Sequence, residues 1–220
     1  MMFNYDIIPG QRLVFVDLAR QLGVSRTPIN NALSILAKEG YLDFVPNQGY
    51  SVHRLTRHEA ESLYEIRKIL EVGAIEKAVG LMTDEKLDNI EQKMIAYEKS
   101  ITDRVQRKSF ILDTDFHEAI IEMTENTMLA ERYRDICQRI FLRFRIEDLR
   151  VERLKEIVRQ HQDLFEAVAK KDVALAEELI KNHHRDGMKN IFAVIFQDDS
   201  KKRVESSRGY NTDKTGEVIF

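Results

Sequence analysis

The chain has 220 residues, with 34 Lys and Arg against 37 Asp and Glu, and its formal net charge of −3 is not that of a nonspecific nucleic-acid binder. It is long enough for one small and one larger domain, and its only cysteine, Cys137, excludes a disulfide within these residues. No apolar run approaches the length that spans a bilayer and the N-terminus lacks a signal pattern, so we expect a cytoplasmic protein with no membrane partner.

Two short helices joined by a tight turn are predicted between Leu18 and Leu42. The first is expected to end at Gly23, because glycine readily adopts the positive φ that closes a helix. The second is expected to begin at Thr27 and Pro28, a residue pair that favours a helix start. The inner side of the first helix and the turn after it comprise Leu18, Ala19, Leu22 and Val24. The apolar stripe of the second helix comprises Ile29, Ala32, Leu33, Leu36 and Ala37.

The outward face of the second helix carries uncharged or basic side chains that can form hydrogen bonds. These are Arg26, Thr27, Asn30, Asn31, Ser34 and Lys38. Such side chains can read base edges and phosphates, although a solvated helix face has the same composition. Two β-rich runs, Tyr41 to Val45 and Gly49 to His53, predict a hairpin directly after the helix. This hairpin would form a wing, from which we assign Gln48 and Gly49 to DNA contact.

The same stretch resembles the GntR superfamily of bacterial transcription regulators, whose pattern is present between Pro9 and Val52. The matching segments are PGQRL, LARQLGVSRTPINNAL, LAKEGYL and NQGYSV. The resemblance implies a winged helix-turn-helix that binds double-stranded operator DNA. Asn30 and Asn31 stand where the family usually has an Arg-Glu pair, and an amide at that place favours adenine. The first helix of the family's domain normally begins about ten residues further upstream, so this domain is shortened or its start is set late.

Charge is distributed unevenly along the chain. The residues before His58 carry a net charge of +2, which leaves −5 for the remainder. This asymmetry predicts that the N-terminal part binds DNA. Because its net charge is only +2, we expect two copies to act on one operator. We therefore expect a homodimer.

Helical periodicity without a convincing strand continues after the wing, beginning with a capping box at Thr56 to Glu59. We predict a mainly α protein, in which residues 1–55 form the winged helix-turn-helix and residues 56–197 form an all-α antiparallel bundle of six or so helices. Residues 198–220 are expected to form a polar tail. The helices are expected near 57–80, 83–97, 110–123, 128–149, 151–168 and 173–195.

Four groups with metal-binding chemistry fall on the apolar stripes of this bundle. They are Asp113, His117, His161 and His183. Each histidine taken singly is more often a hydrogen-bonded core residue than a ligand. Together, three imidazoles and an unpaired carboxylate that face one interior are buried at low cost only around a cation. The pattern therefore predicts a metal ion.

The bundle resembles the FCD ligand-binding domain of the FadR subfamily over about Leu63 to Ile195. The resemblance is carried by IRKILEVGAIEKAV, DTDFHEAI, Asn126 and HQDLFEAVAKKD. It places the four groups on the family's metal ligands. His183 is preferred to His184 because it continues the apolar stripe, whereas His184 is expected to face outward. Three imidazoles and one carboxylate suit zinc best, with nickel, manganese or iron as alternatives.

In the family, the open positions of the metal accept a small carboxylate effector. Arg67 is a candidate second anchor for this acid, and its alternative is a salt bridge to Glu71 one turn later. Arg143 is a further candidate. We therefore interpret the protein as an effector-controlled, DNA-binding transcription regulator and not an enzyme. The alternatives are a metal-dependent enzyme on a helical bundle and a DNA-binding module with a purely structural metal.

Overall fold

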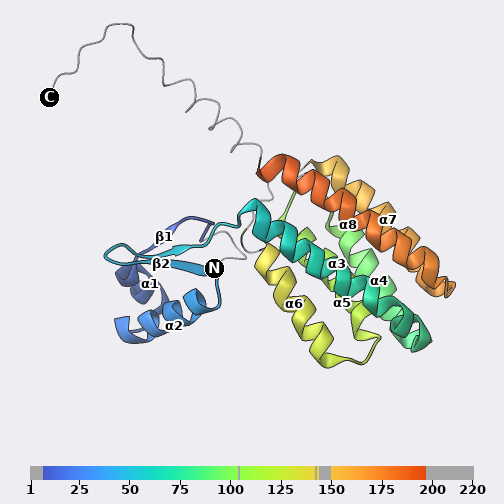
Figure 1. Ribbon diagram of the computed structural model, residues 1–220, viewed down its shortest axis with the longest axis horizontal. Coiled ribbons are helices and arrows are strands. Elements are labelled where there is room, and N and C mark those ends of the chain that lie inside the picture. Colours follow the sequence, from blue (N-terminus) through green and yellow to red (C-terminus); the bar gives the residue numbers. More distant parts are fainter. Residues whose placement is uncertain (1–6, 104, 142, 144–149, 197–220) are drawn as a thin grey trace, which may run out of the picture.

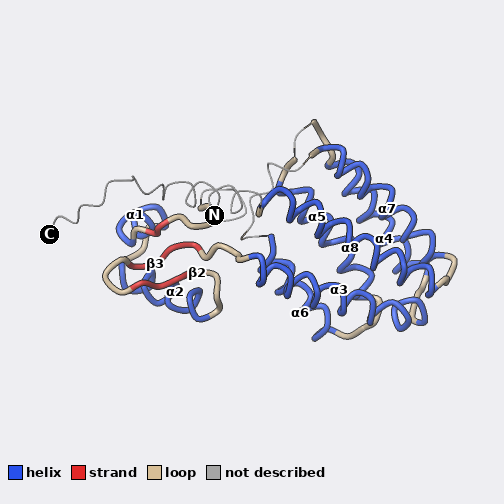
Figure 2. The backbone as a smooth tube through the Cα atoms, turned by 45° about the horizontal axis from the view of Figure 1, so that its top comes forward, coloured by secondary structure: helices blue, strands red, loops and turns tan. Residues whose placement is uncertain are grey.

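The computed structural model describes residues 7–103, 105–141, 143 and 150–196. They form a small unit of helices and strands followed by a larger helical bundle (Figure 1). The strands lie in the small unit, and the described part of the bundle is helical (Figure 2). This arrangement confirms the predicted mainly α fold class. None of the helices among the described residues combines the length and apolarity that crossing a membrane requires.

The small unit is a winged helix-turn-helix. Its elements are β1 (Arg12–Leu13), α1 (Phe15–Leu22), α2 (Arg26–Lys38), β2 (Leu42–Val45) and β3 (Gly49–Val52). The strands form an antiparallel sheet in the order β1-β3-β2, so the predicted hairpin is confirmed and a short third strand is added to it. The turn of the wing closes with a hydrogen bond of 3.0 Å from Gln48 N to Val45 O, and Asn47 has a φ of 64°. Pro46 and Asn47 suit the central positions of such a turn.

Two details of the predicted reader helices are wrong. Helix α2 begins at Arg26 with Ser25 as its N-cap, so Pro28 lies within the first turn, where a missing N–H costs nothing. Leu22 and Val24 were expected to be buried, yet they expose 54% and 45% of their surfaces. The apolar core of this unit includes Leu18 and the partly buried Ala19 of α1, but neither Leu22 nor Val24.

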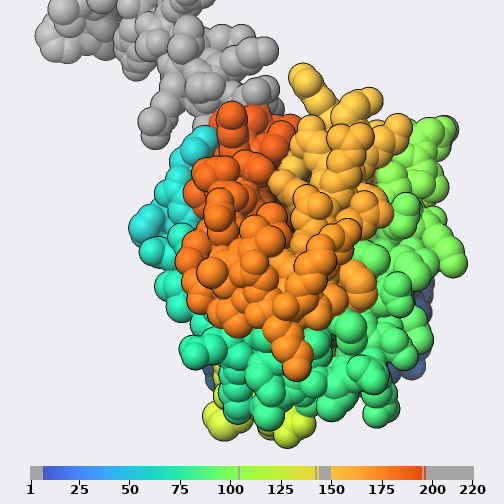
Figure 3. Space-filling view, turned by 90° about the vertical axis from the view of Figure 1, so that its right-hand side faces the viewer, coloured from blue at the N-terminus to red at the C-terminus, as the bar shows by residue number. Residues whose placement is uncertain are grey.

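The bundle consists of six described helices. They are α3 (Arg57–Gly80), α4 (Asp84–Ser100), α5 (Arg107–Glu122), α6 (Thr127–Phe141), α7 (Val151–Ala169) and α8 (Val173–Ile195). The predicted helix 128–149 ends at Phe141, and residues 142 and 144–149 lie outside the described residues, as does the predicted tail 198–220. Figure 3 shows α7 and α8 side by side over one face of the bundle.

Helix α5 is the central helix of the bundle. It packs against α3, α4 and α6. Most of its residues between Ser109 and Ile121 are buried, and they include Asp113 and His117. A helix enclosed on so many sides places even its polar side chains in the interior. The chemistry of the bundle is therefore built around α5.

Helix α3 is tied to the wing at its first turn. The Glu59 backbone N–H donates to Thr56 Oγ1 over 3.2 Å, and the Thr56 N–H donates to Glu59 Oε2 over 2.9 Å, which confirms the capping box. His53 joins the same carboxylate to the wing, because its ring nitrogens lie 2.7 Å from Asp43 Oδ1 and 3.0 Å from Glu59 Oε1. The helix start is thus fixed by contacts from both units.

Thr56→Ala removes the acceptor for the Glu59 N–H, so we expect the free energy of unfolding to fall by about 1 kcal/mol in urea denaturation. Thr56→Ser keeps the acceptor and is the matched control, which should stay near the parent protein. Equal stability of the Ala and Ser variants would show that the cap contributes nothing.

Candidate metal centre and DNA-reading surface

Helices α5, α7 and α8 bring the four predicted ligand groups together. Asp113 and His117 lie one turn apart on α5, His161 lies on α7, and His183 lies on α8. One ligand atom from each residue lies within 4.8 Å of all the others, and all four residues are buried. Asp113 Oδ1 lies 3.3 Å from His161 Nε2 and 4.0 Å from His183 Nε2. Tetrahedral ligands about 2.1 Å from an ion are separated by roughly 3.4 Å, so the spacing suits a metal.

Neighbouring side chains orient two of the imidazole rings. Gln160 Oε1 accepts a hydrogen bond of 3.0 Å from His183 Nδ1, and the Gln160 amide donates to Asp186. His117 Nδ1 lies 3.0 Å from Glu71 Oε2. Partners of this kind on one ring nitrogen leave Nε2 as the ligand and fix its direction.

The unpaired nitrogens and the charge states of the four ligand residues suit a bound cation. Within the described part of the chain, neither nitrogen of His161 has a hydrogen-bond partner, and the same holds for His117 Nε2. Burial lowers the pKa of His161 to about 4, so its ring is neutral near pH 7 and offers a lone pair. Burial opposes ionisation of Asp113, but the adjacent His161 ring and the charge of Arg67 hold the pKa of its carboxyl well below the usual range. Neutral imidazoles around a carboxylate are the state that a divalent ion requires.

The sequence expectation for His184 is wrong. This residue is 5% exposed, and its Nε2 lies 3.1 Å from Glu71 Oε2. Helix α8 packs against both α3 and α7, so its buried face is wide enough for two consecutive residues. His183 therefore faces the ligand cluster while His184 faces Glu71 on α3.

Arg67 forms the salt bridge that was considered as its alternative role. Its Nε donates to Glu71 Oε1 over 2.7 Å, and one of its terminal nitrogens donates to Asp113 Oδ2 over 3.3 Å. Tyr133 completes the network, since its hydroxyl donates to Glu71 Oε1 over 2.9 Å. Arg67 also lines the cavity beside the ligands, and its contact with an effector stays a prediction.

Arg143 does not line the cavity beside the ligands, and its assignment to effector binding stays a prediction. Its guanidinium lies 5.5 Å from the centre of the Tyr41 ring, at the junction with the reader. Arg143 lies two residues beyond the end of α6 at Phe141.

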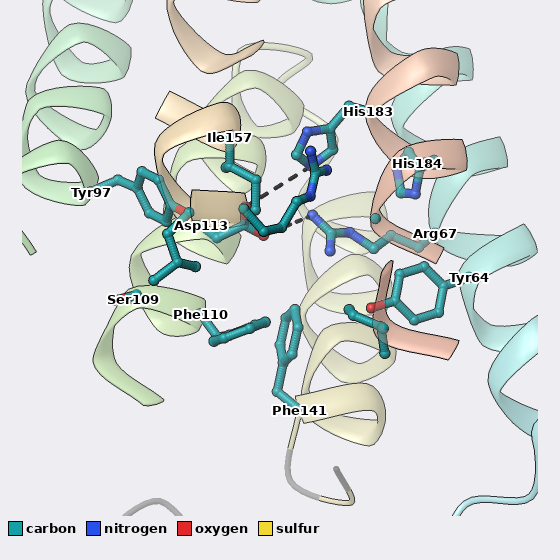
Figure 4. A pocket seen from close by; sticks show the side chains of 14 residues that line it. Tyr64, Arg67, Tyr97, Ser109, Phe110, Asp113, Phe141, Ile157, His183 and His184 are labelled. Atoms are coloured by element: carbon teal, nitrogen blue, oxygen red, sulfur yellow. Dashed lines mark hydrogen bonds and ion pairs between the residues drawn. The ribbon is translucent and has the colours of Figure 1, made fainter. Parts of the chain in front are cut away.

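A cavity of about 40 Å³ adjoins Asp113 and His183 (Figure 4). Its wall is partly apolar and partly polar. The lining residues are Tyr64, Arg67, Tyr97, Ser109, Phe110, Asp113, Phe141, Arg153, Leu154, Ile157, His183, His184, Gly187 and Ile191. The sequence analysis did not identify Arg153, because this residue lies next to the apolar stripe of its helix and was expected to face solvent. The cavity gives a small molecule a place next to the ligand cluster.

The reader contains a second concave surface, a cleft of about 660 Å³ between the wing and the first turns of α1 and α2. Four predicted DNA contacts line it, namely Arg26, Asn30, Gln48 and Gly49. The other four predicted contacts on α2 do not line the cleft; they are Thr27, Asn31, Ser34 and Lys38. Ser34 is partly buried, and the other three side chains are exposed. Arg12 and Asn47 also line the cleft. Arg12 was missed because a strand of two residues leaves no periodicity to recognise.

Comparisons with known proteins agree with both units. Residues 4–52 match the family described as bacterial regulatory proteins, gntR family, and residues 62–186 match the FCD domain. The chain is 29% identical over 196 residues to the HTH-type transcriptional regulator YdhC of Bacillus subtilis, covering 89% of this chain and 88% of that protein. It is 32% identical over 140 residues to the Nta operon transcriptional regulator of Aminobacter aminovorans, covering 64% and 66%.

Solved structures show the same fold. McbR/YncC of E. coli superimposes with a TM-score of 0.74 at 22% identity, over 85% of this chain and 89% of that chain. A GntR regulator from Rhodococcus superimposes with a TM-score of 0.69 at 20% identity, over 87% and 92%. The arrangement of reader and bundle is thus shared with these regulators.

His161→Ala and His183→Ala should each abolish tight metal binding while the helical content stays intact, because three ligands hold an ion poorly against water. Elemental analysis after dialysis and circular dichroism measure the two quantities. His58→Ala is the control, because His58 is exposed on α3 and should not affect metal content. Undiminished metal in both site variants would contradict the ligand assignment.

Proposed function

Because the chain belongs to the GntR family of bacterial transcriptional regulators and carries an FCD domain, we propose that a small carboxylate bound at a metal centre controls its affinity for operator DNA. The observation that carries this proposal is the buried cluster of one aspartate and three histidines beside a cavity. Relatives of the chain are transcriptional regulators and not enzymes, which argues against a metal-dependent enzyme.

Asp113, His117, His161 and His183 would hold the ion, for which zinc is the best match to the donor set. A bound ion supplies a fixed positive charge and an open coordination position for a carboxylate oxygen. A purely structural metal would need no adjoining space. The cavity next to Asp113 and His183 therefore supports the effector role over the structural one.

The reader would bind DNA through the cleft between α2 and the wing. Arg26 and Arg12 supply positive charge there, and Asn30 and Gln48 supply amides that can read base edges. The net charge of +2 before His58 is small for a single reader. A homodimer on a two-fold symmetric operator would double the electrostatic contribution and set the spacing of the half-sites.

Two helices would carry the signal from the cavity to the reader. The first is α3, which holds Arg67 beside the metal ligands and is fixed at its start to the wing through His53. The second is α6, whose Tyr133 hydroxyl donates to Glu71 near the cavity. Further along α6, one terminal nitrogen of Arg139 donates to the Glu39 carbonyl over 2.9 Å. This carbonyl belongs to the C-cap of α2, the proposed recognition helix.

The contact of α6 with the reader includes more than one bond. The Tyr41 hydroxyl donates to Asp135 Oδ1 over 3.4 Å, and the Arg139 guanidinium lies 5.4 Å from the centre of the Tyr41 ring. Asp135 in turn accepts from Arg139 over 2.9 Å, which holds the arginine in place. An acid that displaces Arg67 or Tyr133 would shift α6, and α6 would shift the end of α2.

Operator binding should weaken steeply with salt, and Arg26→Ala should lower the slope of log affinity against log salt by about one per chain if Arg26 grips phosphate. Anisotropy titrations with a DNA fragment selected from random sequences measure this slope. Arg159→Ala removes an exposed charge from the bundle and should leave the slope unchanged. A stoichiometry of one chain per operator would overturn the dimer proposal.

Small carboxylates should bind only to the metal-loaded protein and should change operator affinity by about tenfold to a hundredfold, the usual span of allosteric coupling. Because this coupling is reciprocal, the operator must change the affinity for the acid by the same factor. Calorimetric titration of the acid with and without operator measures that change. Arg139→Ala should reduce this factor while acid binding to the free protein persists. Arg132→Ala, which alters an exposed arginine of the same helix, should keep it. Full coupling in the Arg139 variant would remove α6 from the path.

A further inference from the structure

Three hydrogen-bond donors in the wall of the cavity have no partner among the described residues. They are the hydroxyls of Tyr64 and Tyr97 and the Nε of Arg153. Their residues are 4%, 1% and 6% exposed. Figure 4 shows both tyrosine hydroxyls directed toward the cavity. A buried donor without a partner is costly, so a site built with three of them favours a ligand rich in acceptor oxygens.

Arg153 has no buried counter-ion among the described residues. One terminal nitrogen lies 3.1 Å from Glu156 Oε2, but that side chain is 58% exposed, and the other donates to the neutral Gln160 amide over 3.2 Å. Arg67 differs, because it is paired with Glu71 and Asp113, whose side chains are 2% and 9% exposed. A buried guanidinium stays charged and binds a carboxylate with two parallel hydrogen bonds. Arg153 is therefore available to bind a carboxylate of a ligand.

The buried charges around the cavity balance before an ion binds. The buried charges there are equal in number, Arg67 and Arg153 against Asp113 and Glu71, and Glu156 adds one mostly exposed negative charge beside Arg153. A divalent ion held by neutral imidazoles adds two positive charges that no buried carboxylate of this group compensates. Burying an uncompensated charge is expensive, so the loaded site favours a ligand with two negative charges.

We propose that the effector is a small dicarboxylate, one of whose carboxylates binds at the metal centre while the other is held by Arg153 and the hydroxyls of Tyr64 and Tyr97. This inference rests on the proposed function and adds the chemical class of the effector. The cavity of about 40 Å³ has room for only a few atoms beyond those at the ion. Phe110, Phe141 and Leu154 close the remaining wall, which limits the length of the carbon chain.

The test compares acids of equal carbon number on the zinc-loaded full chain by calorimetry. Malonate is paired with propionate, and succinate with butyrate, so the members of each pair differ chiefly in the second carboxylate. In at least one pair we expect the dicarboxylate to bind tenfold or more tightly. Arg153→Gln should abolish this preference and leave the monocarboxylate affinity within about twofold, since it removes only the distal charge.

Arg159→Gln is the matched control, because it removes an arginine from an exposed position of the same helix and should keep the preference. Zinc content and circular dichroism establish that each variant is loaded and folded. If Arg153→Gln does not fold, Arg153→Lys serves instead, and it should weaken the preference by losing the two-bonded contact.

The outcomes separate the two proposals. Metal-dependent binding of monocarboxylates without a preference for either dicarboxylate would overturn the inference and leave the proposed function standing. A preference that survives in Arg153→Gln would assign the second carboxylate to other residues and overturn the role of Arg153. If none of the four acids binds the loaded protein, the proposed function itself fails along with the inference.

Discussion

The burial of the Asp113 carboxylate is the constraint on which the helical unit depends. An ionised carboxylate removed from water costs several kcal/mol unless cations and donors surround it. Arg67 from α3 approaches one of its oxygens, and His161 and His183 from α7 and α8 approach the other. Three helices, α3, α7 and α8, therefore supply the groups that surround the charge of a residue on α5. A fixed polar cluster of this kind specifies one arrangement of helices, whereas apolar contacts alone would tolerate several.

This dependence links the chemistry of the cavity to the reader. Glu71 accepts from Arg67 and from Tyr133, so α3 and α6 share one carboxylate next to the metal ligands. Both helices also contact the winged unit, α3 through Glu59 and His53, and α6 through Arg139 and the Glu39 carbonyl. A ligand that changes the position of Arg67 must disturb bonds on two paths. Coupling through two helices has a physical basis in these contacts, because each of them joins the bundle to the winged unit through packed elements.

Much of the fold and part of the site were accessible from sequence because they follow from period and local chemistry. The apolar period of 3.6 identified the helices, the Thr56 cap located the start of α3, and the inward stripes selected Asp113, His117 and His161. Long-range packing was not accessible. His184 is buried because α8 contacts two helices at once, and Arg153 turns inward beside a stripe that assigned it to solvent. Arg12 lies in a strand too short to leave any pattern.

We propose that a metal ion and an acid share the cavity beside Asp113. The measurement that tests it most directly is anomalous diffraction at the zinc edge from crystals of the loaded protein grown with succinate. We expect one peak per chain among Asp113, His117, His161 and His183, with density for the acid between this peak and Arg153. A peak at another place, or no peak while the protein still responds to the acid, would contradict it.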